Sequence, residues 1–196
     1  MSAKLISIIG PPAVGKTTLA EILAGELPAE IIREDYAANP FLADSYLGKA
    51  EARLPAQLHY LMSRAAQLSI LSWPGGGVRV TDYGFCQDRI YASMLLAEEE
   101  MGLYNRIARR LEGLIRRPDL VIHLDAREDE LLKRIANRGR EFEKAMTAEF
   151  IASMRKAYDE ADQRLGCEVI RVNCDEVDFR NGDGRASLVT EARERL

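Results

Sequence analysis

The residues best suited to chemistry lie near the N-terminus, where residues 10–17 read GPPAVGKT. This segment matches the pattern G-x-x-x-x-G-K-[ST], and it follows an apolar, β-branched run and opens a helical pattern, which is the context that the motif requires. Glycines let backbone N–H groups turn toward phosphate oxygens, and the helix N-terminus adds partial positive charge. A chance glycine-rich turn is the alternative. The segment therefore predicts a site that binds the phosphates of a nucleotide.

Each part of this loop has an expected task. Lys16 reaches the β- and γ-phosphates, and Thr17 ligates Mg²⁺. The residues expected to contact the nucleotide here are Gly10, Ala13, Val14, Gly15, Lys16, Thr17 and Thr18.

Two acidic residues stand directly after predicted strands. Asp82 has the position of a strand-end acid that holds Mg²⁺ directly or through water, although an N-cap of the next helix is the alternative. Glu34 belongs to a Glu-Asp pair that by itself is typical of a solvated turn. A phosphate loop alone does not separate a kinase from a GTPase or a motor, so the other motifs have to decide.

The elements that must position these residues alternate along the chain. Short apolar runs predict strands at 4–9, 30–33, 77–81, 120–124 and 168–172. Helical spacing predicts helices at 15–27, 54–73, 85–116, 127–137, 147–165 and 186–195. Strands that alternate with helices favour an α/β fold with a five-stranded parallel sheet that is covered on both faces. The length of 196 residues favours one domain, residues 1–196.

Composition narrows the class of protein further. Hydrophobic residues make up 47% and charged residues 30% of the chain, as in soluble globular proteins, and no apolar run approaches a membrane span. The net charge of −4 argues against a general nucleic-acid binder. The N-terminal apolar stretch runs into the phosphate loop without a cleavage site, and the three cysteines form no C-x-x-C pair. We therefore expect a cytoplasmic protein with no membrane or nucleic-acid polymer partner.

Several further motifs occur together and in a recognisable order. They are EDYAANPFL at 34–42, TDYGFCQDRIYA at 81–92 and RGREFE at 138–143, with Tyr46, Gln57 and Arg64 between the first two. In this combination the chain resembles the deoxynucleoside kinase family, from Leu5 to about Phe179. The resemblance implies a P-loop kinase fold with an arginine-rich lid, and Mg²⁺-dependent phosphoryl transfer from ATP to the 5′-hydroxyl of a deoxynucleoside.

The resemblance also implies roles for individual residues. Glu34 matches the general base that takes the proton of the attacking hydroxyl. Gln57 matches a residue that pairs with the base edge, and Arg64 with Asp88 matches a pair that holds the other side of the base. Tyr46 and Glu143 match residues that bind the 3′-hydroxyl.

Helical spacing refines the picture of the predicted helix at 54–73. Gln57 and Arg64 are seven residues apart and share one face with Tyr60, while Gln67 is interpreted as part of a solvated polar face. The opposite, core-facing stripe is expected to comprise Leu58, Leu61, Met62, Ala65 and Leu68.

The resemblance places a lid at about 134–146. Arg138 and Arg140 are implied to close on the triphosphate, and a guanidinium suits this because its planar fork binds phosphate oxygens bidentately. Arg134 is interpreted as an exposed basic residue at a helix end. Asp178 and Phe179 match a loop that contacts the adenine of ATP.

One departure from the family pattern and several alternatives stay open. The commoner pattern has Arg-Ser after the strand-end acid, where this chain has Tyr83-Gly84, so the arginine's task is unassigned. A kinase of another acceptor, such as a nucleoside monophosphate, would need a further basic site. A non-catalytic nucleotide-dependent switch is suggested only by Tyr83. By resemblance, the predicted helices at 54–73 and 147–165 pair in a homodimer.

The expected base preference follows from the chemistry of Asp88. A carboxylate only accepts hydrogen bonds, so it favours a base edge with an exocyclic amine over one with a carbonyl. Thymidine should therefore be a poor substrate. The resemblance to deoxyadenosine, deoxyguanosine and deoxycytidine kinases points the same way, and among these three acceptors a purine deoxynucleoside is favoured.

Overall fold

The computed structural model describes residues 2–196, apart from the side chain of Phe142. Its centre is one parallel sheet with the strand order β2-β3-β1-β4-β5. The strands are β1 (Lys4–Ile9), β2 (Glu30–Ile32), β3 (Val78–Thr81), β4 (Leu120–Asp125) and β5 (Glu168–Asn173). All five predicted strands are present, so the predicted α/β fold with a five-stranded parallel sheet is confirmed.

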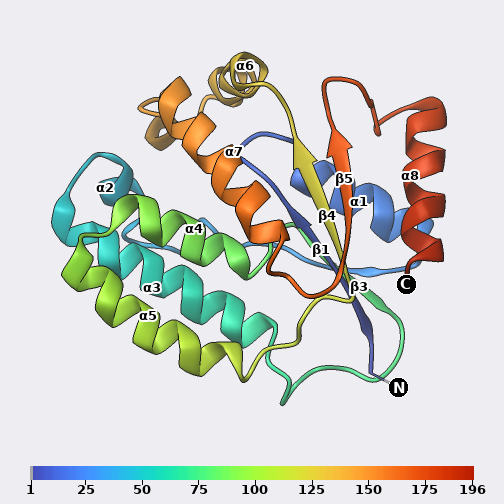
Figure 1. Cartoon of the computed structure of the whole chain (residues 1–196), viewed down its shortest axis with the longest axis horizontal. Helices are drawn as coiled ribbons and strands as arrows, with labels where there is room; N and C mark the ends of the chain where they lie inside the picture. The colour runs from blue at the N-terminus through green and yellow to red at the C-terminus, as the bar shows by residue number, and fades with distance from the viewer. Residues whose placement is uncertain (1) are drawn as a thin grey trace.

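Helices follow the strands and cover the sheet (Figure 1). They are α1 (Lys16–Glu26), α2 (Leu42–Tyr46), α3 (Ala50–Gln67), α4 (Cys86–Leu95), α5 (Glu98–Glu112), α6 (Glu128–Arg138), α7 (Ala148–Asp162) and α8 (Gly182–Glu194), with a 3₁₀ turn at Glu141–Glu143. In the part of the chain that the structure describes, no helix combines the length and the apolar character needed to cross a bilayer.

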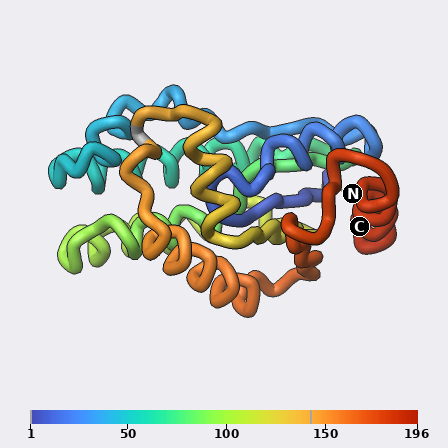
Figure 2. The backbone as a smooth tube through the Cα atoms, turned by 90° about the horizontal axis from the view of Figure 1, so that it is seen from above, coloured from blue at the N-terminus to red at the C-terminus, as the bar shows by residue number. Residues whose placement is uncertain are grey.

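The two faces of the sheet are covered by different helices, because strand residues alternate between faces. Ile6 and Ile8 of β1 belong to a core cluster with residues of α1, α6 and α8. Ile9 and Val121 face the other way and pack with residues of α4 and α7. Figure 2 shows α1 and α7 on opposite sides of the strands. A further cluster, which includes Leu61 and Tyr104, joins α3 and α5 to α4.

Several predicted boundaries need correction. The helix predicted at 54–73 spans Ala50–Gln67, and Met62 is 55% exposed, so its assignment to the core stripe was wrong. The helix predicted at 85–116 is two helices, α4 and α5. The chain is extended at Ala97, whose N–H donates to the Glu100 carboxylate, and this local cap starts a new helix that periodicity alone does not reveal.

The C-terminal end of α7 is fastened to the sheet by a buried polar cluster. Asp162 of α7 accepts a hydrogen bond from Arg171 of β5 at 3.0 Å, and the same oxygen lies 2.7 Å from Nδ1 of His123 on β4. His123 and Asp162 are 2% and 7% exposed. A buried polar group must keep its partner, because its desolvation is otherwise uncompensated. The cluster therefore links two strands to α7, which follows the predicted lid.

We expect Asp162→Ala to destabilise the protein by about 1–3 kcal/mol, because it leaves His123 buried without this partner. Chemical denaturation monitored by circular dichroism measures the change. Glu160→Ala is the matched control, since this exposed acid lies on the same helix and should change the free energy of unfolding by less than about 0.5 kcal/mol. Equal stability of wild type and Asp162→Ala would contradict the assigned role of the cluster.

Candidate active site

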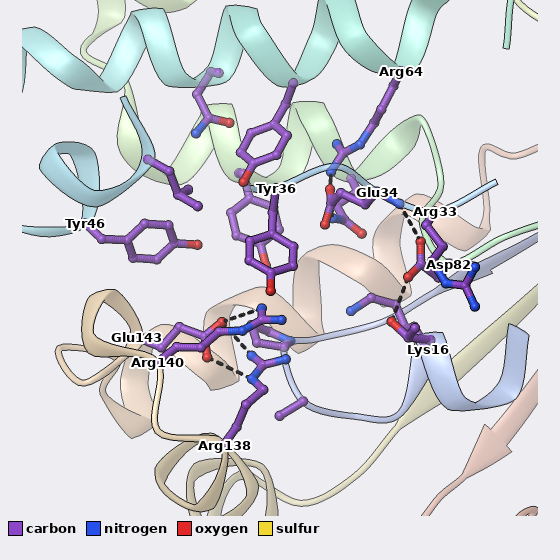
Figure 3. A pocket seen from close by; sticks show the side chains of 18 residues that line it. Lys16, Arg33, Glu34, Tyr36, Tyr46, Arg64, Asp82, Arg138, Arg140 and Glu143 are labelled. Atoms are coloured by element: carbon purple, nitrogen blue, oxygen red, sulfur yellow. Dashed lines mark hydrogen bonds and ion pairs between the residues drawn. The ribbon is translucent and has the colours of Figure 1, made fainter. Parts of the chain in front are cut away.

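A cavity of about 340 Å³ lies between the phosphate loop, the chain after β2, α3 and the segment after α6 (Figure 3). Of the residues predicted from the sequence to form the site, those that line it are Ala13, Lys16, Thr17, Glu34, Tyr46, Gln57, Arg64, Asp82, Arg138, Arg140 and Glu143. Phosphate-binding, acidic and polar groups from distant parts of the chain therefore converge on one cavity.

The backbone of the phosphate loop requires glycine at its two ends. Gly10 and Gly15 have φ angles of 139° and 114°, which disfavour residues with a Cβ atom. A Cβ at Gly10 would also lie 2.2 Å from the carbonyl oxygen of Leu124, and a Cβ at Gly15 would lie 2.9 Å from the ring of Phe179. Val14 between them is buried in the core. The loop is thus held tightly against β4 and Phe179.

The Asp178-Phe179 pair is divided between two environments. Phe179 is 5% exposed, and its ring lies in the core next to Gly15 of the phosphate loop. The Asp178 carboxylate is instead paired with Arg180 at 2.8 Å. The predicted contact of this pair with the adenine stays a prediction.

Lys16 folds back over its own loop. Its Nζ donates hydrogen bonds to the carbonyl oxygens of Gly10 and Pro11, at 2.7 and 2.8 Å. Burial lowers the pKa of Lys16 to about 7, and the carboxylate of Asp82 opposes this shift. The ammonium group therefore titrates near neutral pH.

Asp82 connects the phosphate loop to the segment that carries Glu34. One carboxylate oxygen accepts a hydrogen bond from the Thr17 hydroxyl at 2.6 Å, and the other accepts one from the backbone N–H of Glu34 at 2.8 Å. The N-cap of α4 is Phe85, so the alternative that Asp82 caps this helix was wrong. The Thr17 hydroxyl and the Asp82 carboxylate are hard oxygen donors at one point, which suits Mg²⁺.

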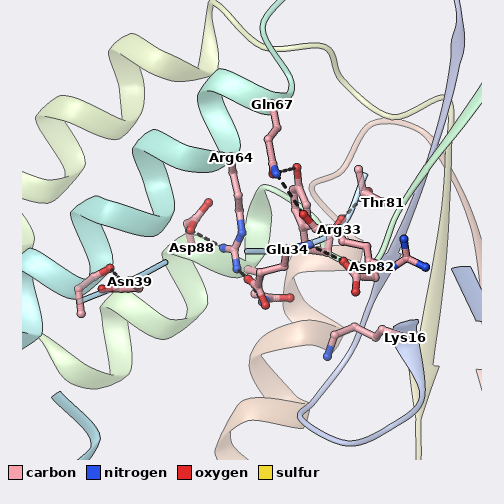
Figure 4. A network of polar contacts seen from close by, with 12 residues as sticks. Lys16, Arg33, Glu34, Asn39, Arg64, Gln67, Thr81, Asp82 and Asp88 are labelled. Carbon is pink, nitrogen blue, oxygen red and sulfur yellow. Dashed lines mark hydrogen bonds and ion pairs between the residues drawn. The ribbon is translucent and has the colours of Figure 1, made fainter. Parts of the chain in front are cut away.

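Arg64 stands at the centre of a buried charge network (Figure 4). Its guanidinium pairs with Glu34 through one nitrogen and with Asp88 through another. Burial raises the pKa of Asp88 to about 6, although Arg64 opposes the shift. Asp88 is not among the described residues that line the cavity, because it lies behind Arg64. Arg64 therefore stands between Asp88 and the cavity in which the base was predicted to lie.

The end of the cavity that Tyr46 and Gln57 line is shaped by α2 and α3. Gln57 is 4% exposed, and burial raises the pKa of the Tyr46 phenol. The chain after β2 is fastened to α3 because the amide of Asn39 donates to the carbonyl oxygen of Ala56 at 3.1 Å. This contact explains why the Asn-Pro pair accompanies the site.

The predicted lid arginines meet at Glu143. Arg138 donates to both carboxylate oxygens of Glu143, at 2.5 and 3.0 Å, and Arg140 lies 3.5 Å from one of them. Arg140 also packs over the ring of Tyr36, 4.0 Å from its centroid. The segment after α6 therefore closes one side of the cavity.

Two interpretations of single residues were wrong. Arg134 is not an exposed helix end, because it is half-buried and pairs with Glu130 at 2.8 Å and with the carbonyl oxygen of Val14 at 3.4 Å. Gln67 is not simply solvated, since its amide bonds to Tyr83 and to the backbone of Arg33.

Sequence reasoning also missed residues that line the cavity. Gln87 is 4% exposed, and its amide nitrogen lies 3.5 Å from the Glu34 carboxylate. Tyr36 and Tyr91 line the cavity as well. Their positions offered a signal, because Tyr36 follows Glu34 by two residues and Gln87 directly precedes Asp88.

The fold and this site define a P-loop phosphotransferase. The family model for deoxynucleoside kinase matches residues 6–195, and the chain belongs to the deoxynucleoside kinase family. A deoxyadenosine kinase of Dictyostelium discoideum is 33% identical over 87% of this chain and 72% of its own length. A deoxyguanosine kinase of Bacillus subtilis strain 168 is 30% identical over 91% of this chain and 90% of its own length.

Solved structures share the fold at lower identity. The structure of a deoxyadenosine kinase from M. mycoides with bound dCTP superposes with a TM-score of 0.80 at 20% identity, over 98% of this chain and 100% of that one. The fold of this chain is therefore that of the P-loop kinases, as predicted.

We expect nucleotide binding to take up a proton through Lys16. At pH 8 the free lysine is largely neutral because its pKa is about 7, and phosphate oxygens favour its charged form, so binding of MgADP should take up close to one proton. Affinity should accordingly fall as pH rises through 7. Calorimetry in buffers of different ionisation enthalpy measures the uptake. Lys16→Arg, which stays protonated, is the control, and equal uptake in both proteins would contradict the assignment.

Proposed function

We propose that the protein transfers the γ-phosphoryl group of ATP to the 5′-hydroxyl of a deoxynucleoside and favours purine deoxynucleosides. The observation that carries this proposal is the position of Glu34. Its carboxylate faces the cavity that Lys16 and Thr17 line, and it is oriented by Arg64. A base, a phosphate loop and a polar acceptor pocket thus share one space.

Catalysis follows from this arrangement. Glu34 accepts the proton of the 5′-hydroxyl as that oxygen attacks the γ-phosphorus, and the bond from the γ-phosphorus to the β–γ bridging oxygen breaks, so that ADP leaves. Lys16 and the lid arginines Arg138 and Arg140 stabilise the charge on the transferring group, which contributes more to phosphoryl transfer than proton removal does. Arg64 pairs with the Glu34 carboxylate and orients it.

Mg²⁺ belongs to the proposal as well. Thr17 and Asp82 would hold it, since their oxygens lie together at the start of α1. The ion would supply charge neutralisation on the β- and γ-phosphates.

The deoxynucleoside lies at the end of the cavity lined by Tyr46, Gln57 and Tyr60. Gln57 pairs with the base edge, and Tyr46 and Glu143 bind the 3′-hydroxyl. Tyr46, Gln57 and Tyr60 are uncharged, and the nearby arginines Arg64 and Arg138 are already paired with carboxylates. A nucleoside monophosphate would need a free basic group there, so this acceptor is disfavoured.

Further parts of the proposal concern assembly and location. The protein forms a homodimer through α3 and α7 and works in the cytoplasm. The exposed Met62 on α3 is consistent with a partner at that helix.

We expect a panel of deoxynucleosides to reveal the acceptor. A coupled ADP-release assay with deoxyadenosine, deoxyguanosine, deoxycytidine and thymidine should give the highest kcat/KM for a purine and the lowest for thymidine. The same panel with Asp88→Ala should show a relative gain for thymidine. The carboxylate only accepts hydrogen bonds, and without it the preference that it imposes on the base through Arg64 is lost. Thymidine as the best wild-type substrate would overturn this assignment.

We expect Glu34→Gln to lower kcat by roughly 10² to 10⁴ with a smaller change in KM, because the amide keeps the shape but cannot take the proton. Steady-state kinetics with the best deoxynucleoside measure both constants. Asp35→Asn is the matched control, since this neighbouring acid is exposed and should leave kcat within about twofold. A kcat of Glu34→Gln close to that of the control would show that Glu34 is not the base.

A further inference from the structure

The peptide group between Arg33 and Glu34 lies just past the last residue of β2 that pairs with β3. Its N–H and C=O therefore cannot be satisfied by the strand ladder and need other partners. The N–H of Glu34 donates to Asp82. The C=O of Arg33 accepts a hydrogen bond from the side-chain amide of Gln67, at 3.0 Å. Side chains thus hold both ends of one peptide group.

The amide of Gln67 is itself held by Tyr83. The phenol O–H of Tyr83 donates to Gln67 Oε1 at 2.6 Å, which orients the amide so that its N–H₂ group faces Arg33. Tyr83 is fully buried, and a phenol is protonated at neutral pH, so the hydroxyl is a donor to Gln67. Figure 4 shows Gln67 reaching from α3 to the backbone beside Glu34.

Tyr83 has a second contact with the same network. The Arg64 guanidinium lies over its ring, 5.2 Å from the centroid, and 5.1 Å from the ring of Tyr60. An aromatic face attracts a guanidinium and restricts its position. Tyr83 therefore contacts the arginine that pairs with Glu34 and, through Gln67, the peptide from which Glu34 extends.

We propose that Tyr83 and Gln67 are positioning residues that set the orientation of Glu34. This inference rests on the proposed function, in which Glu34 is the general base. Asp82 and Tyr83 follow each other directly at the end of β3. Asp82 holds the Arg33–Glu34 peptide through its N–H, and Tyr83 holds the C=O of the same peptide through Gln67. Neither positioning residue needs to touch the substrate. Gln67 and Tyr83 are not among the described residues that line the cavity.

The test compares Tyr83→Phe, Gln67→Met and the double variant with wild type. Tyr83→Phe keeps the ring under Arg64 and removes only the hydroxyl. Each single variant should lower kcat by roughly three- to tenfold, the effect of about one hydrogen bond, and leave KM within about twofold. The double variant should lose no more than the worse single variant, because both changes break one chain of contacts.

Tyr104→Phe is the matched control. This tyrosine is also fully buried, and its hydroxyl has no partner among the described residues. Its kcat should equal that of wild type. A kcat of Tyr83→Phe equal to that of Tyr104→Phe, or strictly multiplicative losses in the double variant, would overturn the inference.

A readout without turnover separates this inference from the proposed function. Hydrogen exchange of the Glu34 amide should become several-fold faster in Tyr83→Phe and in Gln67→Met, because its peptide group is then held at one end only. The Glu34 amide should exchange at the wild-type rate in Tyr104→Phe. Absence of wild-type turnover with every deoxynucleoside would count against the proposed function alone, whereas unchanged exchange in both positioning variants would overturn the positioning role alone.

Discussion

The site depends on the carboxylate of Asp82, which accepts one hydrogen bond from Thr17 and another from the backbone of Glu34. These two bonds join the start of α1 to the chain after β2, although the donors, Thr17 and Glu34, lie 17 positions apart in the sequence. A carboxylate with two occupied oxygens has little freedom to move, so both donors take fixed positions relative to β3. The parallel sheet makes this contact possible because the carboxyl ends of β1, β2 and β3 lie at the same edge.

Charge balance is the second constraint on the site. Arg64 pairs with two carboxylates that lie on either side of it, and its removal would leave both without this counter-charge, one of them, Asp88, in a buried environment. The arginine is buried among tyrosine rings, which attract it without adding charge. The charges are reversed at the opposite wall, where two arginines, Arg138 and Arg140, pair with one carboxylate, Glu143. The cavity thus brings positive and negative groups together on both walls.

Much of the fold could be predicted, because apolar residues repeat at different intervals in strands and in helices. The phosphate loop also requires a strand before it and a helix after it, which places β1 and α1. The break between α4 and α5 could not be predicted from periodicity, since only Leu96 and Ala97 separate the two helices and the apolar pattern continues across them. Among the site residues, Gln57 and Arg64 could be placed on one face from their spacing alone. The separation of Asp88 from the cavity could not be predicted, because it depends on the side of Arg64 on which α4 places the Asp88 carboxylate. Gln67 was misjudged for a related reason, since its partners come from β3 and from the chain after β2.

The contact between Gly15 and Phe179 has a consequence for the evolution of the family. The phosphate loop and the chain after β5 are distant in sequence, but the Phe179 ring occupies the space that any side chain at position 15 would need. A larger residue at position 15 is compatible with the fold only if position 179 becomes smaller and the left-handed backbone is also relieved. A single substitution at position 15 therefore meets two obstacles at once, the Phe179 ring and the left-handed backbone, so we expect glycine to be retained there as long as the loop keeps this shape.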